Sequence, residues 1–454
     1  INKDSVFRLA SVSKVLSVWS FLIEVGDEHF NDPITRYVPE LGAVSNISAT
    51  GVVYDDIDQV RWNEVTLGQL ASHLAGIPRD PAQTDMSAEL VPQQAIALGL
   101  PPLSEDEIPK CGVTGLLRTC SRSGRSEEFF FLSSLTTAEM ISQLLKQHPI
   151  FPTGHSPAYT NMAYALLGFA QEAITGTPVS EAITSNILFA LNMTSSSFSR
   201  KPDSGGVIPG NESVVGWDWD MGTISPSGSL YASTADMVKA GRAILGSKTM
   251  TPAQTRRWLQ PMSQTGVLGS AVGAPWEIRH LMIGGRLTQL YTKQGDTGGY
   301  RAALILSPEH DIGAVIFSAG PIESNSAAVR ETLMNAVGKA VLPMAETQAR
   351  VEARDKFTGT FTDETTNSSV TIEVDHAVPG LVVKHLFSQG VEVIGPSSPF
   401  IQIYGAGQSA RLFLTSLKTL RNTEDGKDTY ESRLGFRATF SMLQAQWTRY
   451  KTRV

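Results

Sequence analysis

Cysteine, long apolar runs and blocks of basic charge are all scarce in this chain. Its 454 residues include only two cysteines, and 37 lysines and arginines stand against 44 aspartates and glutamates. No apolar run reaches the roughly 18 residues of a membrane-spanning helix, so no segment is predicted to cross a membrane. The net charge of −7 and the lack of a basic block argue against nucleic acid or an anionic membrane surface as a partner.

Two common hydrolase signatures are also missing. Neither a Gly-x-Ser-x-Gly nucleophile elbow nor a His-Glu-x-x-His pair occurs in the sequence. The spacing of Cys111 and Cys120 does not suit zinc, and no further cysteine or histidine lies near them. The sequence therefore predicts no metal and no cofactor.

What remains is the composition of an ordinary globular protein, with 41% apolar and 18% charged residues. The length favours two domains. The apolar patterns predict helix from Ser11, a helical middle, then strands over 280–283, 287–293, 300–307 and 312–318, helix over 325–341, a linker over 343–354 and short alternating strands beyond it. The fold class expected is α+β: a domain over 1–345, with a helical subdomain at about 66–245 and an ordered insertion at 79–130, and an all-β domain over 350–454.

A candidate nucleophile lies near the start of the chain, in Phe7-Arg-Leu-Ala-Ser-Val-Ser-Lys14. Ser11 and Lys14 are three residues apart, so a helix beginning at Ser11 places both on one face. The apolar run that follows them should bury Lys14, which favours its neutral form and lets it accept a proton from the serine. A capping serine beside a solvated lysine is the plainer interpretation of the same four residues.

Two later motifs offer partners. In Tyr159-Thr-Asn161 the phenol could relay a proton, and the amide could hold a lysine or a substrate carbonyl. In Lys293-Gln-Gly295 the glycine lets a substrate backbone approach a strand. Taken singly, each motif also fits a pocket-wall tyrosine, a helix-capping asparagine or a surface lysine.

The three motifs together, in this order, resemble the serine β-lactamase and penicillin-binding-protein superfamily, in its class C and esterase-like branch. Longer segments are similar as well: 30–41, 70–77, 159–168 and 295–300. The resemblance covers roughly residues 4–340. The cysteine-bearing insertion and the β-rich tail look most like secreted fungal β-lactamase-like proteins.

This resemblance implies an antiparallel sheet flanked by helices and a metal-free serine hydrolase. Ser11 would form an acyl-enzyme with an ester or amide substrate, while Lys14 and Tyr159 move the proton. Asn161, Lys293 and Gly295 would contact the substrate, and the Asp296 N–H would join that of Ser11 as the oxyanion hole. Lys293 would favour small β-lactam-like or other carboxylate-bearing substrates. The alternatives are an acyltransferase of secondary metabolism and an idle binding protein of the same fold.

Two modest signals indicate the secretory pathway. Cys111 and Cys120 either form a small-loop disulfide or are unrelated thiols, and four sequons occur, at Asn46, Asn192, Asn211 and Asn367. The expected location is extracellular, with a leader absent from the chain. The resemblance also implies strands ahead of the Ser-x-x-Lys helix, where only ten residues precede Ser11. Either an upstream segment is missing or the sheet is smaller.

Overall fold

The computed structural model describes residues 1–45, 55–80, 99, 136–321, 325–375, 379–394, 398, 410–422 and 430–439. These residues form two compact units. The first comprises residues 1–279, 291–306 and 313–334, and the second comprises 280–290, 307–312 and 335–454. Most of the insertion predicted at 79–130, with both cysteines, lies outside the described residues.

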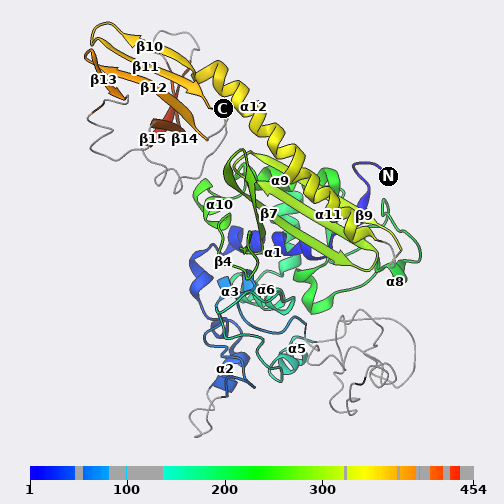
Figure 1. The fold of residues 1–454 in the computed structure, drawn as a ribbon. Helices are drawn as coiled ribbons and strands as arrows, with labels where there is room; N and C mark the ends of the chain where they lie inside the picture. Colours follow the sequence, from blue (N-terminus) through cyan, green and yellow to red (C-terminus); the bar gives the residue numbers. More distant parts are fainter. Residues whose placement is uncertain are drawn as a thin grey trace, which may run out of the picture. The chain divides into compact units, whose positions relative to one another are not determined.

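The first unit opens with a short strand that leads directly into a buried helix. β1 (Val6–Arg8) pairs antiparallel with β3 (Leu230–Ser233), which also pairs with β2 (Ser197–Phe198). In α1 (Ser13–Glu24) every residue from the first through Leu22 is buried. A helix covered on all sides lies inside its domain, and α1 runs through the middle of this unit (Figure 1).

Helices and short helical turns surround α1. α6 (Met162–Thr175) is buried along most of its length and packs on η8 (Gly222–Ser227). Gly168 permits this close approach, because a Cβ there would lie 3.1 Å from Pro226 Cγ. The other helical elements described before β4 are η1 (Ala10–Val12), η2 (Glu28–Asn31), η3 (Ile34–Arg36), α2 (Pro39–Ser45), α3 (Leu67–Ala71), α5 (Thr137–Leu144), α7 (Val179–Ile183), η7 (Thr184–Phe189), α8 (Glu212–Val215), α9 (Thr234–Leu245) and α10 (Pro252–Trp258).

A six-stranded sheet follows α10, with the order β4-β5-β6-β7-β8-β9. Its strands are β4 (Ser263–Gln264), β5 (Ser270–Val272), β6 (Glu277–Ile283), β7 (Arg286–Thr297), β8 (Tyr300–Ser307) and β9 (Ile312–Ala319). β7 and β8 form a tight hairpin in which Thr297 pairs with Tyr300 across two glycines. β7 is longer than β6. β6 begins at Glu277, whose carbonyl oxygen accepts a hydrogen bond of 2.6 Å from the Thr292 hydroxyl, so the end of β7 runs on past it.

The segment predicted as a linker over 343–354 is a helix, so that prediction is wrong. α11 (Ser326–Ala336) continues through η9 (Val337–Val341) into α12 (Leu342–Phe357). In α12 only Leu342 and Glu346 are buried, which leaves no apolar stripe for sequence periodicity to detect. The helix is instead anchored by Glu346, whose buried carboxylate accepts hydrogen bonds from Arg286 (2.9 Å) and His310 (2.9 Å).

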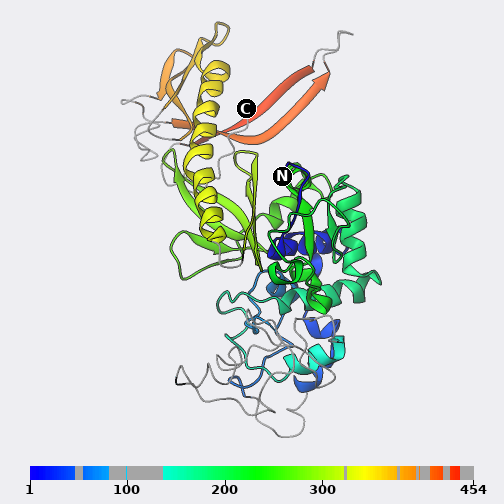
Figure 2. The ribbon, with the colours of Figure 1, turned by 90° about the vertical axis from the view of Figure 1, so that its right-hand side faces the viewer.

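The second unit also contains a six-stranded sheet of its own. Its strands are β10 (Gly359–Asp363), β11 (Ser368–Val374), β12 (Leu381–Ser388), β13 (Val391–Ile394), β14 (Ala410–Asn422) and β15 (Tyr430–Thr439). The order is β10-β11-β12-β14-β15, and β13 pairs with β12. β14 and β15 extend as a two-stranded ribbon beyond the short part of β14 that pairs with β12 (Figure 2). Part of the region predicted as short alternating strands, including residues 399–409, lies outside the described residues.

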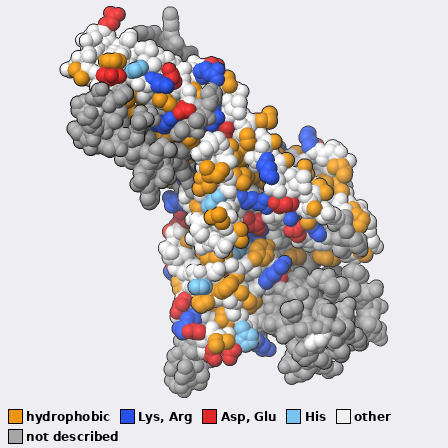
Figure 3. All heavy atoms as spheres, viewed as in Figure 1, with side chains coloured by type: hydrophobic (Ala, Val, Ile, Leu, Met, Phe, Trp, Pro, Cys, Tyr) orange, Lys and Arg blue, Asp and Glu red, His pale blue; other side chains and the backbone are white. Residues whose placement is uncertain are grey.

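This architecture confirms the predicted α+β class: helices flank an antiparallel sheet, and a β-rich region follows. Acidic and basic side chains are intermixed over the face seen in Figure 3, without a block of one sign among the residues coloured there. Within the described parts of the chain, no helix combines the length and apolar character needed to cross a membrane.

Candidate active site

Ser11 lies in η1, the tight turn that joins β1 to α1. Ala10, the first residue of this turn, has a left-handed backbone conformation with a φ of +45°. Ser13 stabilises this turn, because its hydroxyl donates to Ala10 O (2.6 Å) and accepts from Leu230 N (2.9 Å). The prediction placed the helix start at Ser11, whereas α1 begins two residues later. Ser11 is thus held at the positive end of a buried helix.

Lys14 is fully buried one turn along from Ser11. Its Nζ donates to Ser11 Oγ (3.1 Å), Asn161 Oδ1 (2.7 Å) and Ser227 O (2.8 Å). None of these three acceptors is a carboxylate. Burial therefore lowers the pKa of Lys14 to about 8, and the neighbouring charge of Lys293 adds to the effect, against the opposing influence of Tyr159.

Tyr159 contacts the same serine from the other side. Its hydroxyl lies 2.5 Å from Ser11 Oγ. The Nζ atoms of Lys14 and Lys293 lie 5.0 and 5.3 Å from the centre of its ring. Burial alone would raise the pKa of Tyr159, but the two ammonium groups outweigh it and hold the pKa below its ordinary value of 10. The phenol is therefore placed to exchange a proton with Ser11.

Asn161 joins Lys14 to a buried acid that the sequence analysis missed. Its Nδ2 donates to Asp80 Oδ1 (2.8 Å), which turns its Oδ1 toward Lys14. Asn161 occupies the N-cap position of α6 but makes no capping bond there. Thr160 does that instead, by accepting from Ala163 N (3.2 Å). The Asn161 amide is consequently committed to the site rather than to the helix.

His73 backs Tyr159 and was not singled out from the sequence. Its ring stacks on that of Tyr159 at 4.6 Å between centroids, and its Nδ1 accepts from Thr160 N (3.2 Å). Burial, reinforced by Lys14 and Lys293, lowers the pKa of His73 well below 6.5. The ring is therefore neutral and, with Nδ1 accepting, carries its proton on Nε2. The signal that could have identified it was its place in the similar segment over 70–77.

Lys293 and Gly295 lie on the part of β7 that passes Ser11. Lys293 is buried, and its Nζ donates to the carboxylate of Glu277 and to Gln294 O (2.8 Å). Gly295 is required by space: a Cβ there would lie 2.1 Å from Leu9 O and 2.9 Å from Ser11 N. Only a glycine lets the strand approach Ser11 this closely.

The backbone N–H of Asp296 faces the free edge of β7. Gln294 N, two residues earlier, donates to Glu277 Oε2 (3.1 Å) rather than to β8. The N–H groups of successive strand residues point to opposite sides, so those of Gln294 and Asp296, two residues apart, point to the same side, away from β8. The register agrees: Thr297 and Tyr300 flank the two-residue turn as a hydrogen-bonded pair, so the next pair, Asp296 and Arg301, is not hydrogen-bonded. The Asp296 side chain accepts hydrogen bonds from Arg330 (2.5 Å) and ion-pairs with Arg301 (3.1 Å).

The structure brings six of the seven predicted site residues together: Ser11, Lys14, Tyr159, Asn161, Lys293 and Gly295. The seventh, Asp296, directly follows Gly295 on β7. The predicted Cys111, Cys120 and Asn46 lie outside the described residues. Asn192, Asn211 and Asn367 are exposed, and glycosylation there stays a prediction. The Asn211 side chain also caps α8 by accepting from Ser213 N (3.0 Å).

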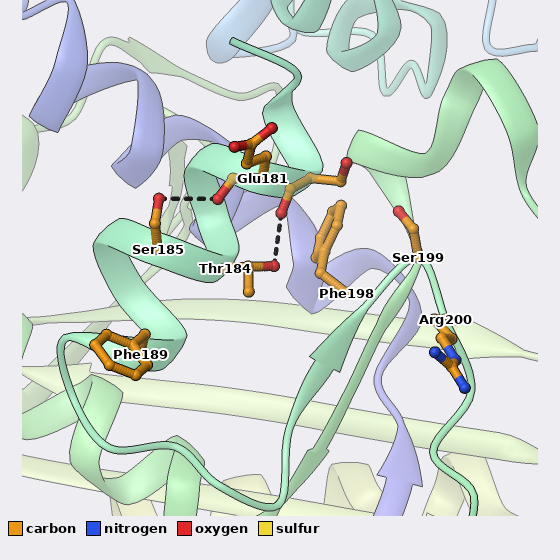
Figure 4. A pocket seen from close by; sticks show the side chains of 8 residues that line it. Glu181, Thr184, Ser185, Phe189, Phe198, Ser199 and Arg200 are labelled. Atoms are coloured by element: carbon orange, nitrogen blue, oxygen red, sulfur yellow. Dashed lines mark hydrogen bonds between the residues drawn. The ribbon is translucent and has the colours of Figure 1, made fainter.

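A separate shallow hollow lies against α7, η7 and β2 (Figure 4). It is lined by Ser180, Glu181, Thr184, Ser185, Phe189, Phe198, Ser199 and Arg200. The hydroxyls of Thr184 and Ser185 donate to the helix carbonyls of Ser180 (2.7 Å) and Glu181 (2.9 Å). Because these two hydroxyls are turned back onto the helix, whereas Ser11 Oγ lies within hydrogen-bond distance of Lys14 and Tyr159, the Ser11 cluster is the better candidate site.

Comparison with known proteins agrees with the fold. A family profile described as "Beta-lactamase" matches residues 1–339, three quarters of the chain. The chain belongs to the β-lactamase family. A second profile, "Beta-lactamase-like-like, C-terminal domain", matches residues 349–450 of this β-lactamase family member. The family resemblance inferred from the sequence is confirmed.

Individual relatives extend the match. A "Beta-lactamase-like protein" of Arthroderma benhamiae is 30% identical over 80% of this chain and 56% of its own length. "Probable hydrolase M10" of a Phoma species is 27% identical over 87% of this chain and 62% of its own length. The chain therefore spans less than two thirds of these relatives.

A solved structure shows the same fold. The "Beta-lactamase/D-alanine Carboxypeptidase" of Yersinia pestis superposes with a TM-score of 0.51 at 17% identity, covering 75% of this chain and 85% of that one. At 17% identity the match supports the fold alone. The predicted β-lactamase/transpeptidase-like fold is confirmed.

Proposed function

We propose that this chain is a serine hydrolase that forms an acyl-enzyme at Ser11. The observation that carries the proposal is that Ser11 Oγ lies within hydrogen-bond distance of two groups able to take its proton, Lys14 Nζ at 3.1 Å and Tyr159 OH at 2.5 Å. A nucleophile flanked by a base, with the base held by a third group such as Asn161, is the usual arrangement for covalent catalysis. The relatives named as hydrolases support the same reaction class.

The first half-reaction follows from these contacts. Ser11 Oγ attacks the substrate carbonyl carbon while its proton passes to Lys14 or Tyr159. The carbonyl oxygen becomes an oxyanion, which the N–H groups of Ser11 and Asp296 stabilise. The bond to the leaving alcohol or amine then breaks, and Tyr159 returns the proton to that leaving group.

The second half-reaction repeats these steps with water. Water gives a proton to the same pair, attacks the ester carbonyl and releases the carboxylic acid with Ser11 restored. An acyltransferase would differ only here, by admitting an alcohol or amine in place of water. Product analysis with such an acceptor added separates the two. An idle binding protein of this fold would form no acyl-enzyme at all.

Replacement of Ser11 tests the proposal. We expect Ser11→Ala to abolish turnover of a panel of aryl esters, amides and β-lactams while the circular dichroism spectrum is unchanged. Ser180→Ala, at a serine of α7 far along the chain, is the matched control and should keep full activity. Turnover that survives in Ser11→Ala would refute the proposed nucleophile.

A further inference from the structure

Lys293 was expected to attract a substrate carboxylate, yet in the structure it already has one. Only 1% of the Lys293 side chain is exposed, and its Nζ ion-pairs with Glu277 Oε1. Glu277 is the first residue of β6 and lies beside the part of β7 that carries Lys293. The charge of this lysine is thus matched within the protein.

The second oxygen of Glu277 occupies a backbone site. Glu277 Oε2 accepts from Gln294 N (3.1 Å), the N–H that precedes Asp296 along the free edge of β7. One carboxylate therefore takes both a buried ammonium group and an adjacent strand N–H. Charge-assisted hydrogen bonds of this kind are strong, and a substrate carboxylate would have to displace Glu277 to make them.

The charge of Lys293 is balanced without any substrate. Glu277 supplies the matching negative charge, whereas Lys14 donates only to uncharged oxygens. The carboxylate of Glu277 is also 34% exposed, so it faces any group that approaches along β7. An anion placed there would meet a like charge within a few ångströms in a partly dry site.

We propose that Glu277 fills the place at Lys293 where a substrate carboxylate would bind. The preferred substrates are therefore esters or amides that carry no charge in the part that lies along β7. This inference rests on the proposed acyl-enzyme function and names its substrate class. Other cations nearby are paired as well. Arg301 and Arg330 are both held by Asp296, and Arg79, 62% exposed beside the Tyr159 ring, is paired with Asp80.

Matched substrates test the proposal on the full chain. Two pairs of aryl esters differ only by a carboxylate or its carboxamide isostere: mono-4-nitrophenyl glutarate against the glutaramate, and 3-carboxyphenyl butyrate against 3-carbamoylphenyl butyrate. The first pair places the charge in the acyl group and the second in the leaving group. We expect kcat/KM to favour the carboxamide by about tenfold or more in at least one pair.

Variants assign that preference to Glu277. Glu277→Gln should move the ratio at least about tenfold toward the carboxylate, because Lys293 then lacks an internal partner. Glu277→Asp, which keeps the charge, should retain the preference for carboxamide. Glu40→Gln removes one exposed acidic charge elsewhere and should leave the ratio unchanged.

Two results would overturn the proposal. One is an unaltered chain that favours the carboxylate, whether or not Arg79→Gln abolishes that preference. The other is a Glu277→Gln ratio that moves no further than in the Glu40 control. Labelling of Ser11 by a fluorophosphonate is run in parallel: a labelled enzyme with the wrong ratio refutes only the substrate class, whereas an unlabelled Ser11 refutes the hydrolase proposal itself.

Discussion

Lys14 on the α1 side of the site and Lys293 on the β7 side are both buried, yet their partners differ. Lys14 donates only to uncharged oxygens, and burial lowers its pKa to about 8. Lys293 is subject to the same burial, but the Glu277 carboxylate outweighs it and raises its pKa above 10.5. This difference suits Lys14 to the proposed role of base and leaves Lys293 as a fixed charge.

Replacing each lysine by methionine tests this contrast most severely. Lys14→Met should lower kcat/KM about 10³-fold, because Ser11 loses a proton acceptor. Lys293→Met should cost about tenfold, because it removes a charge that Glu277 already balances. Steady-state kinetics with an uncharged aryl ester measures both.

Lys248→Met, at an exposed lysine, is the control for both variants and should be silent. Equal losses of kcat/KM in the Lys14 and Lys293 variants would show that the two lysines do not have the different roles proposed here. Circular dichroism of each variant checks that a lost rate is not a lost fold.

Separating the two sides of the site should have the next largest effect. Gly295→Ala would drive a Cβ to 2.1 Å from Leu9 O, so β7 must move away from Ser11 N. We expect kcat/KM to fall about 10²-fold, the usual cost of losing one oxyanion donor. The measurement is again ester turnover, with thermal unfolding to show that the fold persists.

Gly266→Ala provides the matched control, because a Cβ there meets nothing within 4 Å. It should keep both activity and melting temperature. If Gly295→Ala were as active as Gly266→Ala, the close approach of β7 to Ser11 would have no catalytic part.

The site residues that could be predicted from the sequence are those that lie close to one another along the chain, in short motifs. Ser11 and Lys14 share a helical turn, and Lys293 and Gly295 share a strand face, so short motifs were enough to identify them. Their order along the chain, with Tyr159, then carried the family resemblance. The fold class followed from the same patterns.

The residues that were missed depend on contacts between distant segments. Glu277 meets Lys293 across neighbouring strands, Asp80 meets Asn161 across 81 positions, and His73 stacks on Tyr159. A single acidic residue or histidine forms no sequence motif with a partner that is distant along the chain, so such a contact cannot be predicted from spacing. The helix α12 was missed for a related reason, since its anchor is a buried ion pair of Glu346 rather than an apolar face.

The pH dependence of Ser11 labelling tests the central claim most directly. A fluorophosphonate probe is added over a range of pH, and peptide mapping by mass spectrometry reports the site and the rate. Since Lys14 must be neutral to accept the proton, the rate should rise with pH, reach half its maximum near pH 8 and then level off, with the label on Ser11 alone. A label on another residue, or a rate that does not change between about pH 6 and pH 10, would contradict the account.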